Sequence, residues 1–563
     1  LQDLVAAERT AGLAQQALVH AGEAVALVDG LRRGFITPNL RAAFLATQRR
    51  AYELQIELLM DRQAADPASG GDREALAVSE RARARTLLDS LYQGSTGDHG
   101  GSLPSELRER RNALRRRLSA KASQQQLLAD RPGDGKAEAL AREIDGLLMD
   151  LDGVEAEIRR HDPRYAAFSE PPALGAAEIA ALLEPGTLLL EYSLGDEKSF
   201  VWAVGAGTFR SFSLPPGGQI EKLARQVHDE MSRQESGAVP PQEAAKTLAR
   251  LLLAPLWKLA AGAHRLVVVP DAALHYLPFA VLPVPPPGEG WGAADREPLL
   301  LRREVVFLPS ATTLAVQRQR LAGRPPAPHQ AAVLADPVFV SDDPRLAQAG
   351  GAGLRVSQLA GREREGVLRL GFERLAASRR EAEALIKLAP AGDVRTMLDF
   401  AASRQTVLSG ELGSYRILHF ATHGLIDPHN PELSGLVLSQ LDSSGRPVEG
   451  FLRLSEVYDL DLGADLVVLS GCQTALGKEI RGEGLMGMTR GFLYAGVPRV
   501  VGTLWRVEDR ATAELMSRFY RALWQKKLPP AAALREAQLA LRQERRYRDP
   551  HSWAAFVLQG EWR

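Results

Sequence analysis

The sequence has almost no cysteine, since Cys472 is the only one among 563 residues. One cysteine excludes a disulfide within the chain and is typical of a reducing compartment, so we expect a cytoplasmic protein. No apolar run approaches the roughly 20 residues of a transmembrane helix. Basic and acidic residues number 69 each. The overall charge therefore gives no argument for binding nucleic acid or a membrane, and we predict neither.

The first residue is Leu1 rather than methionine, so we expect the natural N-terminus to lie upstream, where a signal peptide or further helical repeats have room. Leucine and alanine recur three and four residues apart over 1–93, which predicts helices resembling tetratricopeptide repeats. Residues 103–162 predict a helical hairpin with a coiled-coil seam of Leu140, Ile144, Leu147, Leu151, Val154 and Ile158. Arginines crowd the first helix of this hairpin, and we expect a solvated face, with a partner-binding face as the alternative; they are Arg110, Arg111, Arg115, Arg116 and Arg117.

From about residue 172 the pattern changes to short apolar runs separated by amphipathic helices. Several runs are continuously apolar rather than alternating, which is typical of strands buried on both faces. The predicted fold class is therefore α/β, a mostly parallel sheet flanked by helices, preceded by an α-helical region.

Two of these apolar runs end in residues that can do chemistry. YRILHFATHG ends with His423 and Gly424, and DLVVLSGCQT carries Cys472 forty-nine residues after the histidine. The carboxyl ends of parallel strands gather at one edge of a sheet, which is where ligands bind. An imidazole there can withdraw the proton of a thiol and turn it into a nucleophile. The spacing matches that between histidine and cysteine in caspases, so we predict a Cys–His hydrolase.

The glycines beside these residues fit the same chemistry. The backbone N–H groups of Gly424 and Cys472 would point into one space and form an oxyanion hole. Gly471 would let a substrate backbone approach closely. The alternative is a buried structural cysteine, because free cysteine is among the most buried residue types.

A second histidine, His419, lies four residues before His423 and raises the question of a metal site. A structural zinc needs four ligands, and only Asp427 and His429 lie nearby in the sequence. We therefore predict no metal and interpret His419 as a hydrogen-bonded core histidine.

The C-terminal part of the chain closely resembles the CHAT-domain family, relatives of caspases and separases. The resemblance is carried by ADPVF, LHFATHG, SGCQT, GEGLMGMTRGFLYAGVPRVVGTLWRVED and HSWAAFVLQGEW. It implies a caspase-hemoglobinase fold over 172–563, with a pseudo-caspase half at about 172–340 and a catalytic half at about 378–563. It also implies a clan CD cysteine peptidase that needs no cofactor, with Cys472 as nucleophile, His423 as general base and acid, and the oxyanion hole named above.

The same resemblance suggests a specificity pocket beside the dyad, lined by Trp505, Asp509 and Glu483. Separases prefer arginine through an acid slightly further along, where this chain has Ala513. An alternative role for Asp509 is a helix N-cap. We therefore expect apolar or basic residues, and not aspartate, before the cut.

Together these features predict a bacterial-style cysteine endopeptidase that cleaves protein substrates. The helical residues 1–160 are expected to gate it or to bind a protein activator or regulator. The alternatives are a catalytically silent scaffold, in which the repeats bind a partner, and acyl transfer to something other than a peptide.

Overall fold

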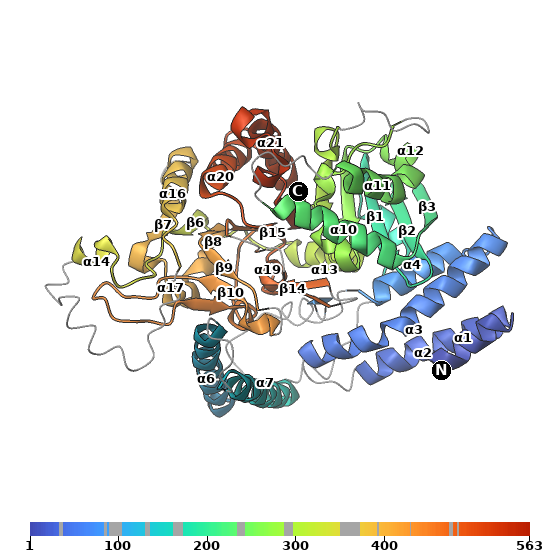
Figure 1. The fold of residues 1–563 in the computed structure, drawn as a ribbon, viewed down its shortest axis with the longest axis horizontal. Helices are drawn as coiled ribbons and strands as arrows, with labels where there is room; N and C mark the ends of the chain where they lie inside the picture. The colour runs from blue at the N-terminus through green and yellow to red at the C-terminus, as the bar shows by residue number, and fades with distance from the viewer. Residues whose placement is uncertain are drawn as a thin grey trace.

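The fold is known from a computed structural model, shown in Figure 1. Cys472 and Glu483 lie outside the residues that it describes. The described ranges are 1–32, 38–83, 87–88, 104–129, 136–161, 173–233, 242–286, 297–348, 372–390, 393–427, 430–471, 474, 477–480 and 484–563.

Eleven described strands form one sheet, in the order β3-β2-β1-β4-β5-β16-β15-β12-β8-β6-β7. The contacts β1–β2, β2–β3 and β15–β16 are antiparallel and the others are parallel. The strands are β1 (Thr187–Leu194), β2 (Ser199–Gly205), β3 (Thr208–Leu214), β4 (Arg265–Val269), β5 (Glu304–Phe307), β6 (His329–Ala335), β7 (Val394–Leu398), β8 (Tyr415–Ala421), β12 (Leu466–Leu469), β15 (Arg499–Thr503) and β16 (Phe556–Gly560).

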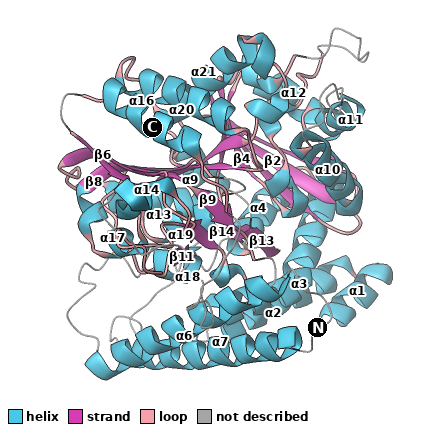
Figure 2. Cartoon of the chain, turned by 60° about the vertical axis from the view of Figure 1, so that its left-hand side comes forward, coloured by secondary structure: helices cyan, strands magenta, loops and turns pink. Residues whose placement is uncertain are grey.

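Helices cover both faces of this sheet, as Figure 2 shows. Every residue of β4 and β12 is buried, as their apolar runs LVVV and LVVL predict. One face carries α16 (Ala376–Leu388), α20 (Asp509–Trp524) and α21 (Pro530–Gln543). The other carries α13 (Ala311–Leu321), α17 (Arg404–Leu408), α18 (Leu454–Val457) and α19 (Met488–Tyr494). Shorter helices are α9 (Ala176–Ala181), α12 (Trp257–Ala260) and α14 (Pro344–Gln348), and α10 (Gly217–Ser232) and α11 (Gln242–Leu252) follow β3.

The N-terminal region is helical, and it confirms the predicted fold class together with the sheet. It contains α1 (Gln2–Thr10), α2 (Ala14–Arg32), α3 (Pro38–Ala65) and α4 (Gly71–Arg81). Helices α6 (Ser105–Ala129) and α7 (Lys136–His161) then pack against each other as a hairpin. Five seam residues of α7 are buried, and their cluster also includes Leu433 of the sheet domain. Within the described residues, no helix is both long and apolar enough to cross a membrane.

The arginine-rich face of α6 is only partly solvated. Arg110, Arg116 and Arg117 are exposed, as expected for a solvated face. Arg111 and Arg115 are half-buried and form ion pairs with Asp459, which follows α18. The hairpin is therefore attached to the sheet domain by charge as well as by the contact with Leu433.

Buried polar side chains join the first helices to the sheet domain. Glu80 of α4 accepts hydrogen bonds from the backbone N–H groups of Ala311 and Thr312, at 2.9 and 2.8 Å, and so caps the start of α13. Arg83 donates to Glu191 of β1 at 3.1 Å. Because each of these groups is buried, the helical region is part of the same packed unit as the sheet.

The strand that was predicted to end at His423 ends earlier, and this corrects the sequence prediction. Strand β8 stops at Ala421, and His423 begins a separate strand, β9 (His423–Leu425). That strand pairs antiparallel with β10 (Gly435–Val437), which pairs in turn with β11 (Phe451–Arg453). A further small hairpin is formed by β13 (Gly477–Ile480) and β14 (Gly484–Gly487).

Candidate functional site

The two chemical motifs follow neighbouring parallel strands. Strand β12 pairs with β8, and Leu469 lies opposite Phe420. His423 and Cys472 each follow one member of this pair by three residues in the sequence. The backbone N–H of Ser470 also donates to the Phe420 carbonyl, at 2.8 Å. The register therefore brings the two motifs to the same edge of the sheet.

Gly471, the residue before Cys472, lies against the backbone on both sides of His423. A Cβ atom at Gly471 would lie 2.3 Å from the Thr422 carbonyl oxygen and 3.4 Å from the Gly424 nitrogen. The first distance is far inside van der Waals contact, so a side chain at position 471 would force the two segments apart. Glycine is required here by the close approach of two backbones.

The His423 ring is held by one hydrogen bond and two aromatic contacts. Its Nε2 lies 2.8 Å from the carbonyl oxygen of Glu373, which can only accept. A neutral ring must therefore carry its proton on Nε2, which leaves Nδ1 as a base. The rings of Phe339 and Phe372 each lie 5.3 Å from the imidazole, centre to centre. Burial lowers the pKa of His423, while the bond to Glu373 and the carboxylate of Asp509 oppose that shift.

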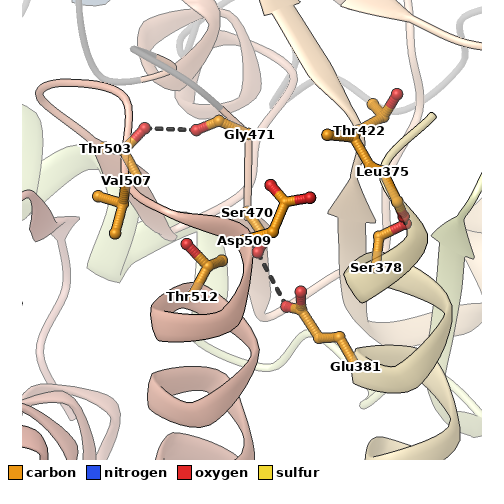
Figure 3. A pocket seen from close by; sticks show the side chains of 10 residues that line it. All are labelled: Leu375, Ser378, Glu381, Thr422, Ser470, Gly471, Thr503, Val507, Asp509 and Thr512. Carbon is orange, nitrogen blue, oxygen red and sulfur yellow. Dashed lines mark hydrogen bonds between the residues drawn. The ribbon is translucent and has the colours of Figure 1, made fainter. Parts of the chain in front are cut away.

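A pocket opens beside these motifs at the carboxyl ends of β8, β12 and β15 (Figure 3). It encloses roughly 400 Å³, including its open mouth. Thr422 and Gly471, which precede His423 and Cys472 in the chain, both line it. The other walls come from the first two turns of α16, the start of α20 and the strand ends and loop beside them: Leu375, Ser378, Glu381, Ser470, Thr503, Val507, Asp509 and Thr512.

Among the described residues, the pocket lining contains two carboxylates and no basic side chain. Glu381 is 2% exposed and accepts a hydrogen bond from Ser470 Oγ at 2.8 Å. Asp509 makes no hydrogen bond or ion pair within the part of the chain that the structure describes. Burial raises the pKa of Asp509, and the charges of His423 and Arg506 oppose this rise. The pocket is therefore electrostatically suited to a cation.

The N-cap interpretation of Asp509 is wrong. Asp509 is the first helical residue of α20, Glu508 precedes it at the N-cap, and Glu508 makes no side-chain capping bond. Trp505 is also placed elsewhere: it is 1% exposed, it donates from Nε1 to the His551 carbonyl at 3.0 Å, and it is not among the residues that line the pocket. Sequence reasoning missed Glu381, because an acid in the predicted helix EAEALIKLA carries no signal of a site 90 residues further on.

His419 is a buried, hydrogen-bonded core residue, which confirms its interpretation. It has no exposed surface, and its Nδ1 lies 3.0 Å from the Tyr520 hydroxyl. Its Nε2 lies 2.9 Å from a Glu381 oxygen but makes no hydrogen bond among the described residues. Among the described residues, no three His, Cys, Asp or Glu side chains are grouped so that they could hold a metal ion.

Comparison with known proteins gives distant relatives and one family. The chain is 27% identical to tetratricopeptide repeat protein 28 of Homo sapiens over 370 residues, which are 58% of this chain and 13% of that protein. The Mus musculus protein of the same name is 27% identical over 373 residues, with the same shares. The chain thus spans about an eighth of the length of these relatives.

Two solved structures are similar at low identity. The separase of a Saccharomyces cerevisiae separase–securin complex has a TM-score of 0.40 and 11% identity, over 99% of this chain and 49% of that chain. The Arg-specific cysteine proteinase gingipain R, from Porphyromonas gingivalis, has a TM-score of 0.34 and 9% identity, over 61% of this chain and 74% of that chain. The model of the CHAT domain family matches residues 242–561, more than half of the sequence. The chain therefore belongs to the CHAT-domain family.

Proposed function

We propose that this chain is a cysteine endopeptidase in which Cys472 and His423 form the catalytic dyad. The observation that carries the proposal is the contact of Gly471 with the backbone on either side of His423, because it brings the chain next to Cys472 up to a histidine whose Nδ1 is available as a base. The dyad depends on a free thiol, so we also propose a reducing compartment such as the cytoplasm.

In the proposed mechanism, Nδ1 of His423 takes the thiol proton and the Cys472 thiolate attacks the scissile carbonyl. The developing oxyanion accepts hydrogen bonds from the backbone N–H groups of Gly424 and Cys472. His423 then gives its proton to the leaving amine, and a thioester forms. Water hydrolyses the thioester with His423 again acting as the base, which restores the thiol.

The pocket supports a basic residue before the cut. Its two carboxylates and its hydroxyl groups can bind an ammonium or guanidinium group, and Asp509 makes no bond within the described chain that would compete. An aspartate side chain would be repelled. The pocket thus narrows the sequence-based expectation of apolar or basic residues to lysine or arginine.

The helical region supports a regulatory role. The hairpin contacts Leu433, which lies in the short segment between β9, the strand that carries His423, and β10. A protein partner that moved α6 and α7 would therefore act on the neighbourhood of the histidine. We propose that an activator or regulator binds the helical region.

The test is hydrolysis of a fluorogenic peptide library together with labelling by iodoacetamide. We expect Cys472→Ala and His423→Ala to abolish hydrolysis and to leave the circular dichroism spectrum unchanged. His329→Ala is the matched control, because His329 is exposed at the start of β6, whereas the site lies at the carboxyl ends of the parallel strands. Wild-type turnover by the Cys472→Ala protein would refute the peptidase. An inert wild-type chain that still binds partners through its helices would favour the scaffold.

A further inference from the structure

The carbonyl that orients His423 belongs to a segment held by an ion pair. Glu373 accepts from His423, and the next residue, Arg374, forms a two-pronged contact with Asp336. Arg374 Nε lies 2.9 Å from one carboxylate oxygen and Nη2 lies 2.7 Å from the other. This geometry fixes the position and the orientation of the guanidinium, and so restrains the backbone beside it.

Asp336 is a rigid anchor for that contact. It follows β6 directly, its side chain has no exposed surface, and its φ of 49° is in the left-handed region. Its backbone N–H donates to Ser378 Oγ at 3.0 Å. A non-glycine residue persists in this conformation only where its surroundings determine it. The backbone that carries the carboxylate is therefore held in place by its surroundings.

Two further arginines complete the cluster around Asp336. Arg345 Nη1 lies 3.1 Å and Arg379 Nε lies 2.7 Å from its oxygens. Both arginines also pair with Asp399, and Arg345 pairs with Asp343. Three cations thus face three carboxylates. Loss of Arg374 alone leaves the Asp336 charge neutralised by two arginines, and Arg374 is 38% exposed, so its removal makes no buried cavity.

The segments that carry Asp336 and Arg374 also contact the imidazole ring of His423. Phe339, three residues after Asp336, packs against His423, and Phe372, two residues before Arg374, packs against it as well. The two phenyl rings are 5.9 Å apart. The ion pair therefore joins the two segments whose rings enclose the imidazole.

We propose that Arg374 and Asp336 are positioning residues, which hold the Glu373 carbonyl against Nε2 and thereby keep the basic Nδ1 of His423 available. The inference rests on the proposed peptidase function for its consequence in catalysis, but the placement of the proton on the ring does not depend on that function. The charged groups that act on the ring are Asp509, Arg506 and Glu373, and none of them belongs to the ion pair.

The test compares Arg374→Gln with Arg379→Gln. Both remove one arginine from Asp336, but only Arg374 adjoins Glu373. The tautomer of His423 is read by long-range proton–nitrogen NMR, with His423→Ala used to assign its signals. Thiol reactivity is read as the iodoacetamide rate against pH, and it reports Cys472 alone because the chain has no other cysteine. Peptide hydrolysis gives kcat and KM.

We expect wild type and Arg379→Gln to show one tautomer, with the proton on Nε2, and the same pH midpoint of alkylation. Arg374→Gln should show both tautomers, a midpoint moved toward that of a free thiol, near 8.5, and a kcat lower by roughly 10–100-fold with KM little changed. Arg374→Lys keeps the charge but loses the second hydrogen bond to Asp336. Its tautomer populations, its pH midpoint and its kcat should lie between those of wild type and Arg374→Gln. It also serves as the test variant if Arg374→Gln does not fold.

An unchanged tautomer and pH midpoint in Arg374→Gln would overturn the proposal, as would equal changes in Arg379→Gln. Failure of the peptidase function is a separate outcome. It would appear as no hydrolysis by wild type, while the NMR and alkylation results would still decide whether the ion pair orients the ring.

Discussion

Replacing Asp509 by asparagine should remove the preference for a basic residue before the cut, whereas any effect through the pKa of His423 should be the same for all peptides. Asp509 and Glu381 are the carboxylates of the pocket, and only Glu381 has hydrogen-bonding partners within the described residues. The charge of Asp509 is therefore the one free to pair with a substrate. Asparagine keeps the size of the side chain, so the substitution tests charge alone.

The size of the effect follows from the surroundings of Asp509, which is exposed to solvent although neighbouring groups partly desolvate its carboxylate. Two unit charges about 4 Å apart interact by about 1 kcal/mol in water and about 4 kcal/mol near a protein surface. Because Asp509 is solvent-exposed, screening keeps the value toward the lower end. We take about 1–2 kcal/mol, which corresponds to roughly a 5–30-fold loss in kcat/KM for arginine peptides.

The assay is a pair of peptide series that differ only before the cut, with arginine in one and leucine in the other. The ratio of their kcat/KM values cancels changes in folding and in the active fraction. Glu508→Gln is the matched control, because Glu508 is the adjacent acid, is exposed and does not line the pocket. An arginine-to-leucine ratio that is unchanged in Asp509→Asn, or equally changed in Glu508→Gln, would refute the reasoning.

The pH dependence of the arginine-to-leucine ratio gives a second test of the role of Asp509. Partial desolvation by the neighbouring groups raises the pKa of the exposed Asp509, so its carboxylate forms only at a higher pH than that of an ordinary aspartate. As the pH falls through this raised pKa, the group becomes neutral and the arginine preference should disappear. In Asp509→Asn the ratio should not vary over that range. A ratio that titrates equally in both proteins would assign the effect to another group.

Three further perturbations address the core and the attachment of the helices. His419→Ala should lower the free energy of unfolding by about 1–3 kcal/mol, because the hydrogen bond to the Tyr520 hydroxyl is lost. Activity should fall only in proportion to the unfolded fraction, and a stable but inactive variant would show that His419 is not merely a core residue. Glu80→Ala should speed hydrogen exchange at the first turn of α13, where it frees two buried N–H groups, and unchanged protection would exclude the cap. Burial raises the pKa of Glu191 well above the usual value, so stability should fall as the pH rises from the pKa of an ordinary carboxyl through the raised one; this fall should be absent in Glu191→Gln, and an equal pH dependence of urea unfolding in both proteins would contradict this.

The sequence allowed the sheet to be predicted where burial left a clear pattern. The run that became β12 is continuously apolar, and the run that became β4 is apolar after Arg265, because helices cover both faces, and that pattern is visible in a single chain. The place of β16 could not be predicted, because nothing local shows that the last strand enters the middle of the sheet between β5 and β15. The division of the sheet domain near residue 340 stays a prediction, since one sheet runs across both parts.

The site was predictable only in part, for reasons visible in particular residues. The motif ATHG continues an apolar run, so the sequence does not show that β8 stops at Ala421 and that His423 starts another strand. The carbonyl of Glu373 is a backbone group, and any residue would supply it. The roles of Cys472 and His423 remain predictions that rest on the motifs and on the proposal above.

The two acids that line the pocket differ in burial, and we expect them to have different roles. Glu381 is buried, accepts from Ser470 and lies beside His419, so its charge is committed to holding α16 against the ends of β8 and β12. A buried carboxylate with such partners cannot turn to a substrate without leaving them unsatisfied. Asp509 lies at the start of α20, without hydrogen-bonding partners in the described chain and exposed to solvent, so it can pair with a substrate cation without breaking a bond within those residues. Selectivity should therefore follow Asp509, and the integrity of the pocket should follow Glu381.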